Sequence, residues 1–308
     1  MLKGEPTKMM GRTVVVTGAT GAQGGGVSRQ LLLSGKYRVR CLTRNPNSDK
    51  ANGLKLAGAE VRRGDLDDPA SLHMALEGCW GVFGVTNYWE HFAKELPQGK
   101  NLVDAVQAAK VPHFIFSTLP YAKKITQGQI EIPHFDTKGQ IEEHARELRL
   151  GATFVNVAFY FENFIHFFPP QKQADGSYAF AFPQGDVPLA GVAVEDVGGV
   201  VAGIFADPEP FRDKTVGVVG DDLPCAEYAA TMSRVLGKKV VYNHMPREQY
   251  AALGFPGAVD LANMFEYNRL HIPNRQADIH GSLRLYSGMR RFEPWVKANK
   301  AALLNVLK

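Results

Sequence analysis

The chain has 308 residues, of which 45% are hydrophobic, so it is long enough to bury one large core or two coupled lobes. Its formal charge is only +4 and its Lys and Arg residues are scattered, which argues against a nucleic-acid-binding surface. The apolar stretches are too short to span a bilayer, and Met1–Pro6 lacks the apolar segment of a secretion signal. We therefore expect a soluble cytoplasmic protein.

Its three cysteines, Cys41, Cys79 and Cys225, are far apart in the sequence, and two of them fall in predicted core strands. We expect buried free thiols in a reducing compartment, with neither a disulfide framework nor a metal site. The histidines likewise show no spacing typical of metal ligands.

The first predicted strand, Val14–Val16, runs into glycines three residues apart at Gly18, Gly21 and Gly24, and a helix follows. Glycines there let the backbone turn sharply and pass close to a ligand. The helix N-terminus would direct N–H groups and the positive end of its dipole at an anion. A loop that merely turns the chain is the alternative. The strand before and the helix after favour dinucleotide binding by Gly18–Gln23.

The second predicted strand, Tyr37–Thr43, ends at Arg44. NAD-preferring sites carry an Asp or Glu about 20 residues past the glycines, which binds the ribose 2′-hydroxyl. Here the position holds Arg44, and the next carboxylate is Asp49. A permanently charged guanidinium suits a 2′-phosphate, so we predict NADP(H) over NAD(H). The alternative is an ordinary exposed loop arginine.

Strands and helices continue to alternate, which is typical of a parallel sheet with helices on both faces. We predict an α/β, Rossmann-type doubly wound parallel sheet with a smaller, interleaved α/β lobe. The further strands are predicted at 60–63, 80–85, 113–117 and 153–157, and the helices at about 50–56, 69–77, 99–110 and 135–148.

Beyond Ala158 the alternation stops, and 160–188 is predicted to form the rim of a pocket. A helix from Val194 and a strand at 215–219 are expected to return to the main sheet. Asp221 and Asp222 are expected in a solvated loop. We predict a dinucleotide-binding domain at 1–158 with a return segment at about 194–220, and a C-terminal lobe at 159–193 and 221–308.

Polar residues follow the predicted strands at the edge where ligands bind in such sheets. Asp65 and Leu66 follow the third strand, and Thr86 and Asn87 follow the fourth. Asp65 would bind an adenine amino group or cap its own turn, and both interpretations stay open. Thr86 and Asn87 are expected near the ribose.

Short-chain dehydrogenases place Tyr-x-x-x-Lys at the start of the helix after the fifth strand, where the tyrosine exchanges the proton. The matching stretch here carries His134 at the tyrosine position and Lys138 at the lysine position. Imidazole exchanges protons near neutral pH, so catalysis by His134 or Lys138 is one hypothesis. A structural histidine is the other. We expect Lys138 to bind the nicotinamide ribose in either case.

The segment leaving the sixth strand is rich in aromatic residues. Phe159 and Phe164 are expected in the core, whereas Tyr160, Phe161 and Asn163 would close over a nicotinamide ring.

Several segments of this sequence resemble the NmrA-like family of atypical short-chain dehydrogenases, and in particular its animal NADPH-sensor branch. They are Gly18–Gly25, Thr43–Pro46, Val85–Glu90, His134–Gly139, Tyr160–Asn163 and Gly254–Phe265.

The resemblance implies a Rossmann domain that binds NADP(H) with little dehydrogenase activity and responds to the NADPH/NADP ratio by changing conformation and self-association. It also implies a homodimer in the cytoplasm and nucleus. Protein partners would be argininosuccinate synthase and NF-κB pathway components, bound through about 158–194. An NADPH-dependent reductase of a small carbonyl or quinone, using Lys138 or His134, is the alternative.

Together, motifs and resemblance predict a set of cofactor-binding residues. They are Gly18, Ala19, Thr20, Gly21, Ala22, Gln23, Arg44, Asn45, Pro46, Asn47, Ser48, Asp65, Leu66, Thr86, Asn87, Tyr88, Lys138, Tyr160, Phe161, Glu162 and Asn163.

Overall fold

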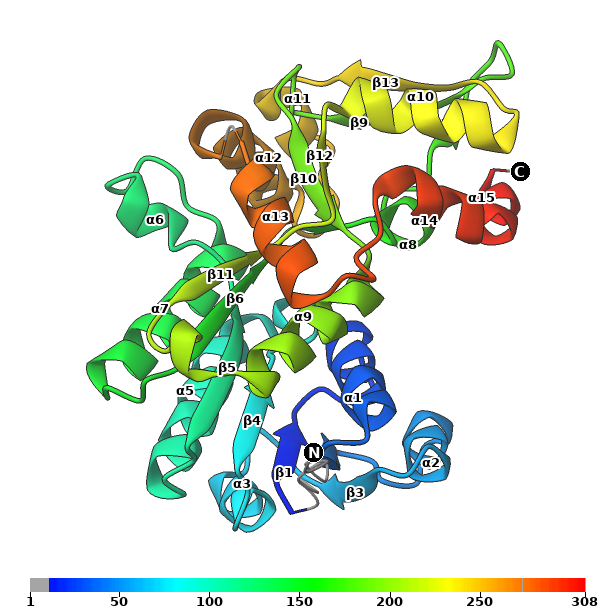
Figure 1. Ribbon diagram of the computed structural model, residues 1–308. Coiled ribbons are helices and arrows are strands. Elements are labelled where there is room, and N and C mark those ends of the chain that lie inside the picture. Colours follow the sequence, from blue (N-terminus) through cyan, green and yellow to red (C-terminus); the bar gives the residue numbers. More distant parts are fainter. Residues whose placement is uncertain (1–10, 273, 308) are drawn as a thin grey trace, which may run out of the picture. The chain divides into compact units, whose positions relative to one another are not determined.

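The computed structural model describes residues 11–272 and 274–307 (Figure 1). The N-terminal residues examined above for a secretion signal lie outside this range. The chain divides into two compact units that alternate along the sequence. The first unit comprises residues up to 117, 141–155 and 198–215, and the second comprises 118–140, 156–197 and 216 onward.

Within the described residues, the main sheet has seven strands in the order β11-β6-β5-β4-β1-β2-β3. The pairs β3–β2, β2–β1, β1–β4 and β4–β5 are parallel. The strand order reverses next to β1, which is the switch point of a doubly wound sheet. The predicted fold class is therefore confirmed. The strands are β1 (Thr13–Val16), β2 (Arg38–Thr43), β3 (Glu60–Arg63), β4 (Gly81–Gly84), β5 (His113–Thr118), β6 (Thr153–Val157) and β11 (Thr215–Val218).

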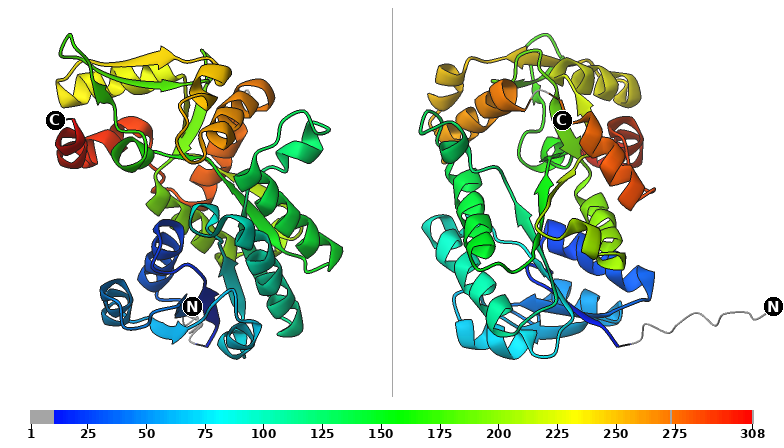
Figure 2. Two further views of the ribbon diagram at one scale, coloured as in Figure 1. Left: turned by 180° about the vertical axis from the view of Figure 1, so that it is seen from behind. Right: turned by 60° about the vertical axis from the view of Figure 1, so that its left-hand side comes forward.

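Helices cover both faces of this sheet in the first unit (Figures 1 and 2). On one face, apolar side chains of α3, α5 and the C-terminal part of α7 share a core with inward residues of β1, β4, β5 and β6. On the other face, Phe205 of α9 lies against Gly81 of β4. The helices and turns are α1 (Ala22–Ser34), α2 (Asp49–Leu56), α3 (Pro69–Leu76), α4 (Tyr88–His91), η1 (Phe92–Lys94), α5 (Glu95–Ala108), α7 (Pro133–Glu147), α9 (Val194–Ala206) and η2 (Glu209–Phe211).

The second unit is built around an aromatic core that includes Phe161, Phe164, Tyr228, Phe292 and Trp295. Its sheets have the orders β12-β10-β7 and β13-β9-β8. The elements are α6 (Ala122–Ile125), β7 (Phe159–Tyr160), α8 (Asn163–His166), β8 (Gln171–Lys172), β9 (Tyr178–Phe182), β10 (Leu189–Val192), β12 (Asp221–Leu223), α10 (Cys225–Leu236), β13 (Val240–His244), α11 (Arg247–Ala251), α12 (Ala258–His271), α13 (Gln276–Leu285), α14 (Phe292–Ala298) and α15 (Lys300–Val306).

One local expectation was wrong. Asp221 is not in a solvated loop: it opens β12 and is only 8% exposed. Its carboxylate accepts hydrogen bonds from Arg291 Nη1 and from the backbone N–H of Phe292, both at 3.0 Å. These partners are about 70 residues away in the sequence, so no local pattern indicates that this carboxylate is satisfied while buried.

The three cysteines are buried and free, as predicted. Among residues 11–272 and 274–307, no cluster of three or more His, Cys, Asp or Glu side chains is arranged to hold a metal ion. The helices within that range are too short or too polar to cross a membrane.

Candidate functional site

The turn after β1 is built by the residues that the glycine pattern singled out. The Thr17 hydroxyl accepts a hydrogen bond from the backbone N–H of Val85 at 2.9 Å, which ties the end of β1 to the end of β4. Gly18 follows with a φ of +57°, a left-handed conformation that favours glycine. The N–H of Gly21 then donates to the Gly18 carbonyl at 2.8 Å and closes the turn.

The turn leads into α1, whose N-cap is Gly21. Glycine has no side chain, so the N-cap residue itself does not cap the helix. The first turn also contains no acidic residue. Its backbone N–H groups and the positive end of the dipole therefore suit an external anion such as a pyrophosphate.

The third glycine has a packing role. A Cβ atom on Gly24 would lie 2.3 Å from the Gly18 carbonyl oxygen and 2.6 Å from that of Thr17. Only glycine lets α1 approach the turn this closely, which keeps the helix N-terminus directly beyond the end of β1.

Arg44 lies directly after β2, at the position predicted for the 2′-phosphate contact. Its guanidinium forms an ion pair with Glu90 of α4, and the hydrogen bond to Glu90 raises the pKa of Arg44. The negative charges of Asp65 and Asp67 act on Arg44 in the same direction. Glu90 lies 46 residues further along the chain, so no local sequence pattern indicates that it pairs with Arg44.

The loop that follows Arg44 is organised by its own side chains. Asn45 Oδ1 accepts a hydrogen bond from the N–H of Asn47 at 3.1 Å. Ser48 caps α2 by accepting from the N–H of Ala51 at 3.3 Å. Pro46 is half-buried, and Asn45 and Asn47 are exposed.

Asp65 lies in the loop after β3 and caps its own turn, which was one of the two roles predicted for it. Asp65 Oδ1 accepts a hydrogen bond from the N–H of Asp67 at 3.0 Å. The neighbouring Leu66 is half-buried, and its carbonyl accepts from Asn101 Nδ2 at 2.9 Å. The capping bond uses one carboxylate oxygen, so the adenine contact of Asp65 stays a prediction.

After β4, Thr86 is buried and its hydroxyl donates to Glu95 Oε1 at 2.7 Å. Glu95 begins α5 and is fully buried, although the sequence analysis gave it no role. Asn87 donates from Nδ2 to Glu90 Oε2 at 3.2 Å. Tyr88 opens α4 beside them and is half-buried. The first unit thus brings the glycine turn, Arg44 and the ends of β3 and β4 to one edge of the sheet.

The second unit contains the stretch that corresponds to Tyr-x-x-x-Lys. His134 is 7% exposed, and its Nδ1 forms a hydrogen bond with Asp260, in the first turn of α12. The backbone N–H of His134 also donates to Asp260 Oδ2 at 3.1 Å. Lys138 lies one helical turn further along α7 and is half-buried. Asp260 was missed by the sequence analysis, since 126 residues separate it from His134.

The aromatic segment after β6 packs largely inward. Phe161 is 0% exposed, and its ring centroid is 5.0 Å from that of Phe292. Phe164 is equally buried, as predicted, whereas Phe159 is half-buried. Tyr160 and Asn163 are half-buried as well. These residues and Lys138 belong to the second unit, so their joint use with the glycine turn stays a prediction.

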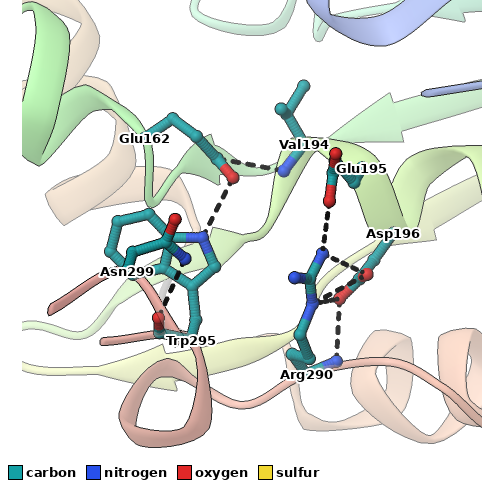
Figure 3. A network of polar contacts seen from close by, with 7 residues as sticks. All are labelled: Glu162, Val194, Glu195, Asp196, Arg290, Trp295 and Asn299. Atoms are coloured by element: carbon teal, nitrogen blue, oxygen red, sulfur yellow. Dashed lines mark hydrogen bonds and ion pairs between the residues drawn. The ribbon is translucent and has the colours of Figure 1, made fainter. Parts of the chain in front are cut away.

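Glu162 links this segment to two distant parts of the second unit (Figure 3). Its carboxylate accepts from the N–H of Val194, at the start of α9, and from Trp295 Nε1, both at 3.0 Å. A neighbouring ion pair, in which Arg290 Nη2 lies 2.7 Å from Asp196 Oδ1, holds the segment before α14 against the same helix start. Burial raises the pKa of Glu162 above its ordinary value. The structure therefore places the Glu162 carboxylate in a structural network.

Glu162→Gln should change how stability depends on pH. Because the folded-state pKa of Glu162 is raised, the folded protein holds this proton more tightly than the unfolded chain. Its contribution is present at low pH and is lost as pH rises from the ordinary value of 4.5 through the raised value. The unfolding free energy of Glu162→Gln relative to wild type should therefore increase with pH, measured by urea denaturation at several pH values. A difference that falls with pH would contradict the assignment.

The doubly wound sheet with a glycine turn at its switch point defines a Rossmann-type α/β protein. The chain belongs to the NmrA-like family, whose model matches residues 10–295. An NmrA-like family domain-containing oxidoreductase of Aspergillus hancockii is 34% identical over 274 residues, 82% of either chain. A relative in Dictyostelium discoideum is 33% identical over 250 residues, 78% of this chain and 83% of that protein. The crystal structure of NmrA, a negative transcriptional regulator, in complex with NADP has a TM-score of 0.79 at 23% identity, covering 93% of this chain and 94% of that one.

Proposed function

We propose that this protein is an NADP(H)-binding regulator that responds to the NADPH/NADP ratio through conformational and oligomeric change, like the animal NADPH-sensor branch of its family. The observation that carries the proposal is the N-terminus of α1 after the Gly18 turn, with Gly21 at its N-cap and no acidic residue in its first turn, together with Arg44 directly after β2. The first feature suits a pyrophosphate, and the second suits a 2′-phosphate. NmrA, described as a negative transcriptional regulator, has been crystallised with NADP and with NAD, which supports a nicotinamide coenzyme site in a regulatory protein.

The regulatory part of the proposal depends on which residue occupies the position of the proton-donating tyrosine of short-chain dehydrogenases. The position of the tyrosine carries His134, which is buried and engaged by Asp260. A coenzyme site that lacks this tyrosine favours a protein that senses the coenzyme over an enzyme that oxidises or reduces it.

Calorimetry and sedimentation velocity test this proposal together. We expect NADPH to bind about tenfold or more tightly than NADH, because a charged group on the protein meets an additional phosphate. We also expect the sedimentation coefficient to differ with and without saturating NADPH, since a sensor must bind two states unequally. Equal affinities would contradict the coenzyme assignment. Identical sedimentation profiles in saturating NADPH and in saturating NADP⁺ would contradict the oligomeric response to the NADPH/NADP ratio.

A protein-partner role is proposed for the segment at about 158–194, by resemblance to the same branch. Phe167 in this segment is 73% exposed, so the segment presents an apolar side chain that a partner could contact. Argininosuccinate synthase and NF-κB pathway components are the proposed partners, and the homodimer is the proposed assembly. Co-sedimentation with purified argininosuccinate synthase, with and without NADPH, tests the first of these, and the absence of any mixed species would contradict it.

A reductase of a small carbonyl or quinone is the second candidate, because a specific geometry favours it. A carboxylate on Nδ1 fixes the tautomer and orientation of a histidine and stabilises its protonated form. The Asp260–His134 pair has this arrangement, and Lys138 lies on the same face of α7 one turn away. Reduction of a carbonyl needs a hydride, which bound NADPH supplies, and a proton, which His134 would deliver to the oxygen. The Aspergillus hancockii relative is described as an oxidoreductase.

NADPH absorbance followed over a panel of carbonyls and quinones separates the two candidates. If the reductase is correct, Lys138→Ala should lower kcat/KM at least about a hundredfold, because it removes a group that orients the coenzyme and tunes proton transfer. Thr137→Ala, one residue away on α7, is the matched control and should retain turnover. Turnover at the detection limit with every substrate would favour the regulator.

A further inference from the structure

The ion pair between Arg44 and Glu90 joins the loops that follow two strands on either side of β1. Arg44 follows β2, and Glu90 belongs to α4, shortly after β4. In the sheet order, β2 and β4 flank β1, whose own end leads into the Gly18 turn. The bridge therefore connects the two loops that border the start of α1.

Both oxygens of the Glu90 carboxylate are engaged. Oε1 binds the Arg44 guanidinium, and Oε2 accepts from Asn87 Nδ2 at 3.2 Å. The hydrogen bond to Arg44 lowers the pKa of Glu90, so the carboxylate is charged at neutral pH. The side chains of Arg44 and Glu90 are 55% and 46% exposed. An ion pair this exposed contributes little stability, and a stronger anion displaces it readily.

Arg44 is also surrounded by further negative charge. Asp65 and Asp67, on the loop after β3, act electrostatically on its guanidinium. A phosphate arriving at Arg44 would meet Glu90 at contact distance and these two carboxylates beyond it. Two anions at one exposed guanidinium repel each other, so phosphate and Glu90 are alternatives there.

We propose that Glu90 is an internal competitor for the 2′-phosphate of NADP(H): its carboxylate occupies Arg44 in the coenzyme-free protein, and the phosphate displaces it and releases α4. This inference rests on the proposed NADP(H) binding. A coenzyme without the 2′-phosphate leaves the bridge in place. The exchange therefore gives α4 two positions, one favoured by coenzymes that carry the 2′-phosphate and one kept by coenzymes that lack it. Because NADPH and NADP⁺ both carry this phosphate, the exchange distinguishes NADP(H) from NAD(H).

Binding of 2′,5′-ADP and of 5′-AMP to Glu90→Gln isolates this exchange, because the two probes differ in the 2′-phosphate. Glutamine keeps the length of the side chain and its acceptor for Asn87 but removes the charge. We expect Glu90→Gln to bind 2′,5′-ADP about three- to tenfold more tightly than wild type, and 5′-AMP within about twofold. Asp67→Asn removes a nearby carboxylate that does not contact Arg44, and it should shift 2′,5′-ADP binding by less than about twofold.

Combining Glu90→Gln with Arg44→Ala gives a double-mutant test of this role. If Glu90 acts through Arg44, adding Glu90→Gln to Arg44→Ala should change the affinity for 2′,5′-ADP clearly less than it does in wild type. A similar gain in both backgrounds would show that Glu90 acts as a general repulsive charge, and it would overturn the competitor role.

The fluorescence of Trp89 reports movement of α4, because Trp89 is next to Glu90 in the sequence and is 39% exposed. We expect 2′,5′-ADP, but not 5′-AMP, to change tryptophan emission, and Trp89→Phe to remove that change. An affinity for 2′,5′-ADP that Glu90→Gln leaves unchanged or weakens overturns the inference alone. Absence of 2′,5′-ADP binding to both proteins would overturn the proposed coenzyme site as well.

Discussion

Arg44→Ala should weaken NADPH binding by about 10- to 100-fold while changing NADH binding by less than about threefold. The 2′-phosphate carries close to two negative charges, and the guanidinium is the permanently charged donor at the end of β2. Removing it leaves Glu90, Asp65 and Asp67 to repel the phosphate. Titration calorimetry with both coenzymes measures the change in preference directly.

Arg44→Lys separates charge from geometry. Lysine keeps the positive charge but lacks the planar fork, so we expect an affinity for NADPH between those of wild type and Arg44→Ala. Arg38→Ala serves as the control, because Arg38 is an exposed arginine at the opposite end of the same strand. It should leave both affinities unchanged. An equal loss for NADPH and NADH in Arg44→Ala would mean that this residue does not read the 2′-phosphate.

Asp260→Ala should lower the free energy of unfolding by about 3 kcal/mol, because it deprives two buried donors of their acceptor. These donors are the backbone N–H and the ring of His134, and both His134 and Asp260 are at most 8% exposed. Urea denaturation measures the loss. Asp260→Asn keeps one acceptor oxygen, so it should cost about half as much.

Asp186→Ala is the matched control for that measurement, since Asp186 is exposed in the same unit. It should change stability by no more than about 0.5 kcal/mol. If Asp260→Ala were as stable as wild type, the Asp260–His134 pair would not anchor α7 to α12. Unchanged turnover in a stable Asp260→Asn variant would also remove the Asp260–His134 pair from the reductase candidate.

The strands of the main sheet were predictable because their signals are local. β6 was predicted at the residues where it occurs, and β2 and β5 within about one residue at each end. Each is a short apolar run between turn residues, so a window of a few residues contains the information. The glycine turn was predictable for the same reason, since Gly18, Gly21 and Gly24 each meet a steric requirement of their neighbours.

The second unit was harder to predict. The segment 160–188 was expected to form the rim of a pocket, yet it contains β9, whose Phe180 and Phe182 are buried against residues from β13 and α12. Two of these partners, Tyr242 for Phe180 and Phe265 for Phe182, are more than 60 residues away in the sequence.

The α/β alternation, the turn that suits a pyrophosphate and the cation at the end of β2 can be recognised in the sequence, because each depends on residues that are adjacent in the chain. The partners of the charged side chains depend instead on the folded chain. The tertiary structure placed Glu90 on Arg44, Asp260 on His134, and Arg291 on Asp221. Such pairs are set by strand order and helix packing, and the attraction between two charges depends on their distance in space, whatever their separation along the chain.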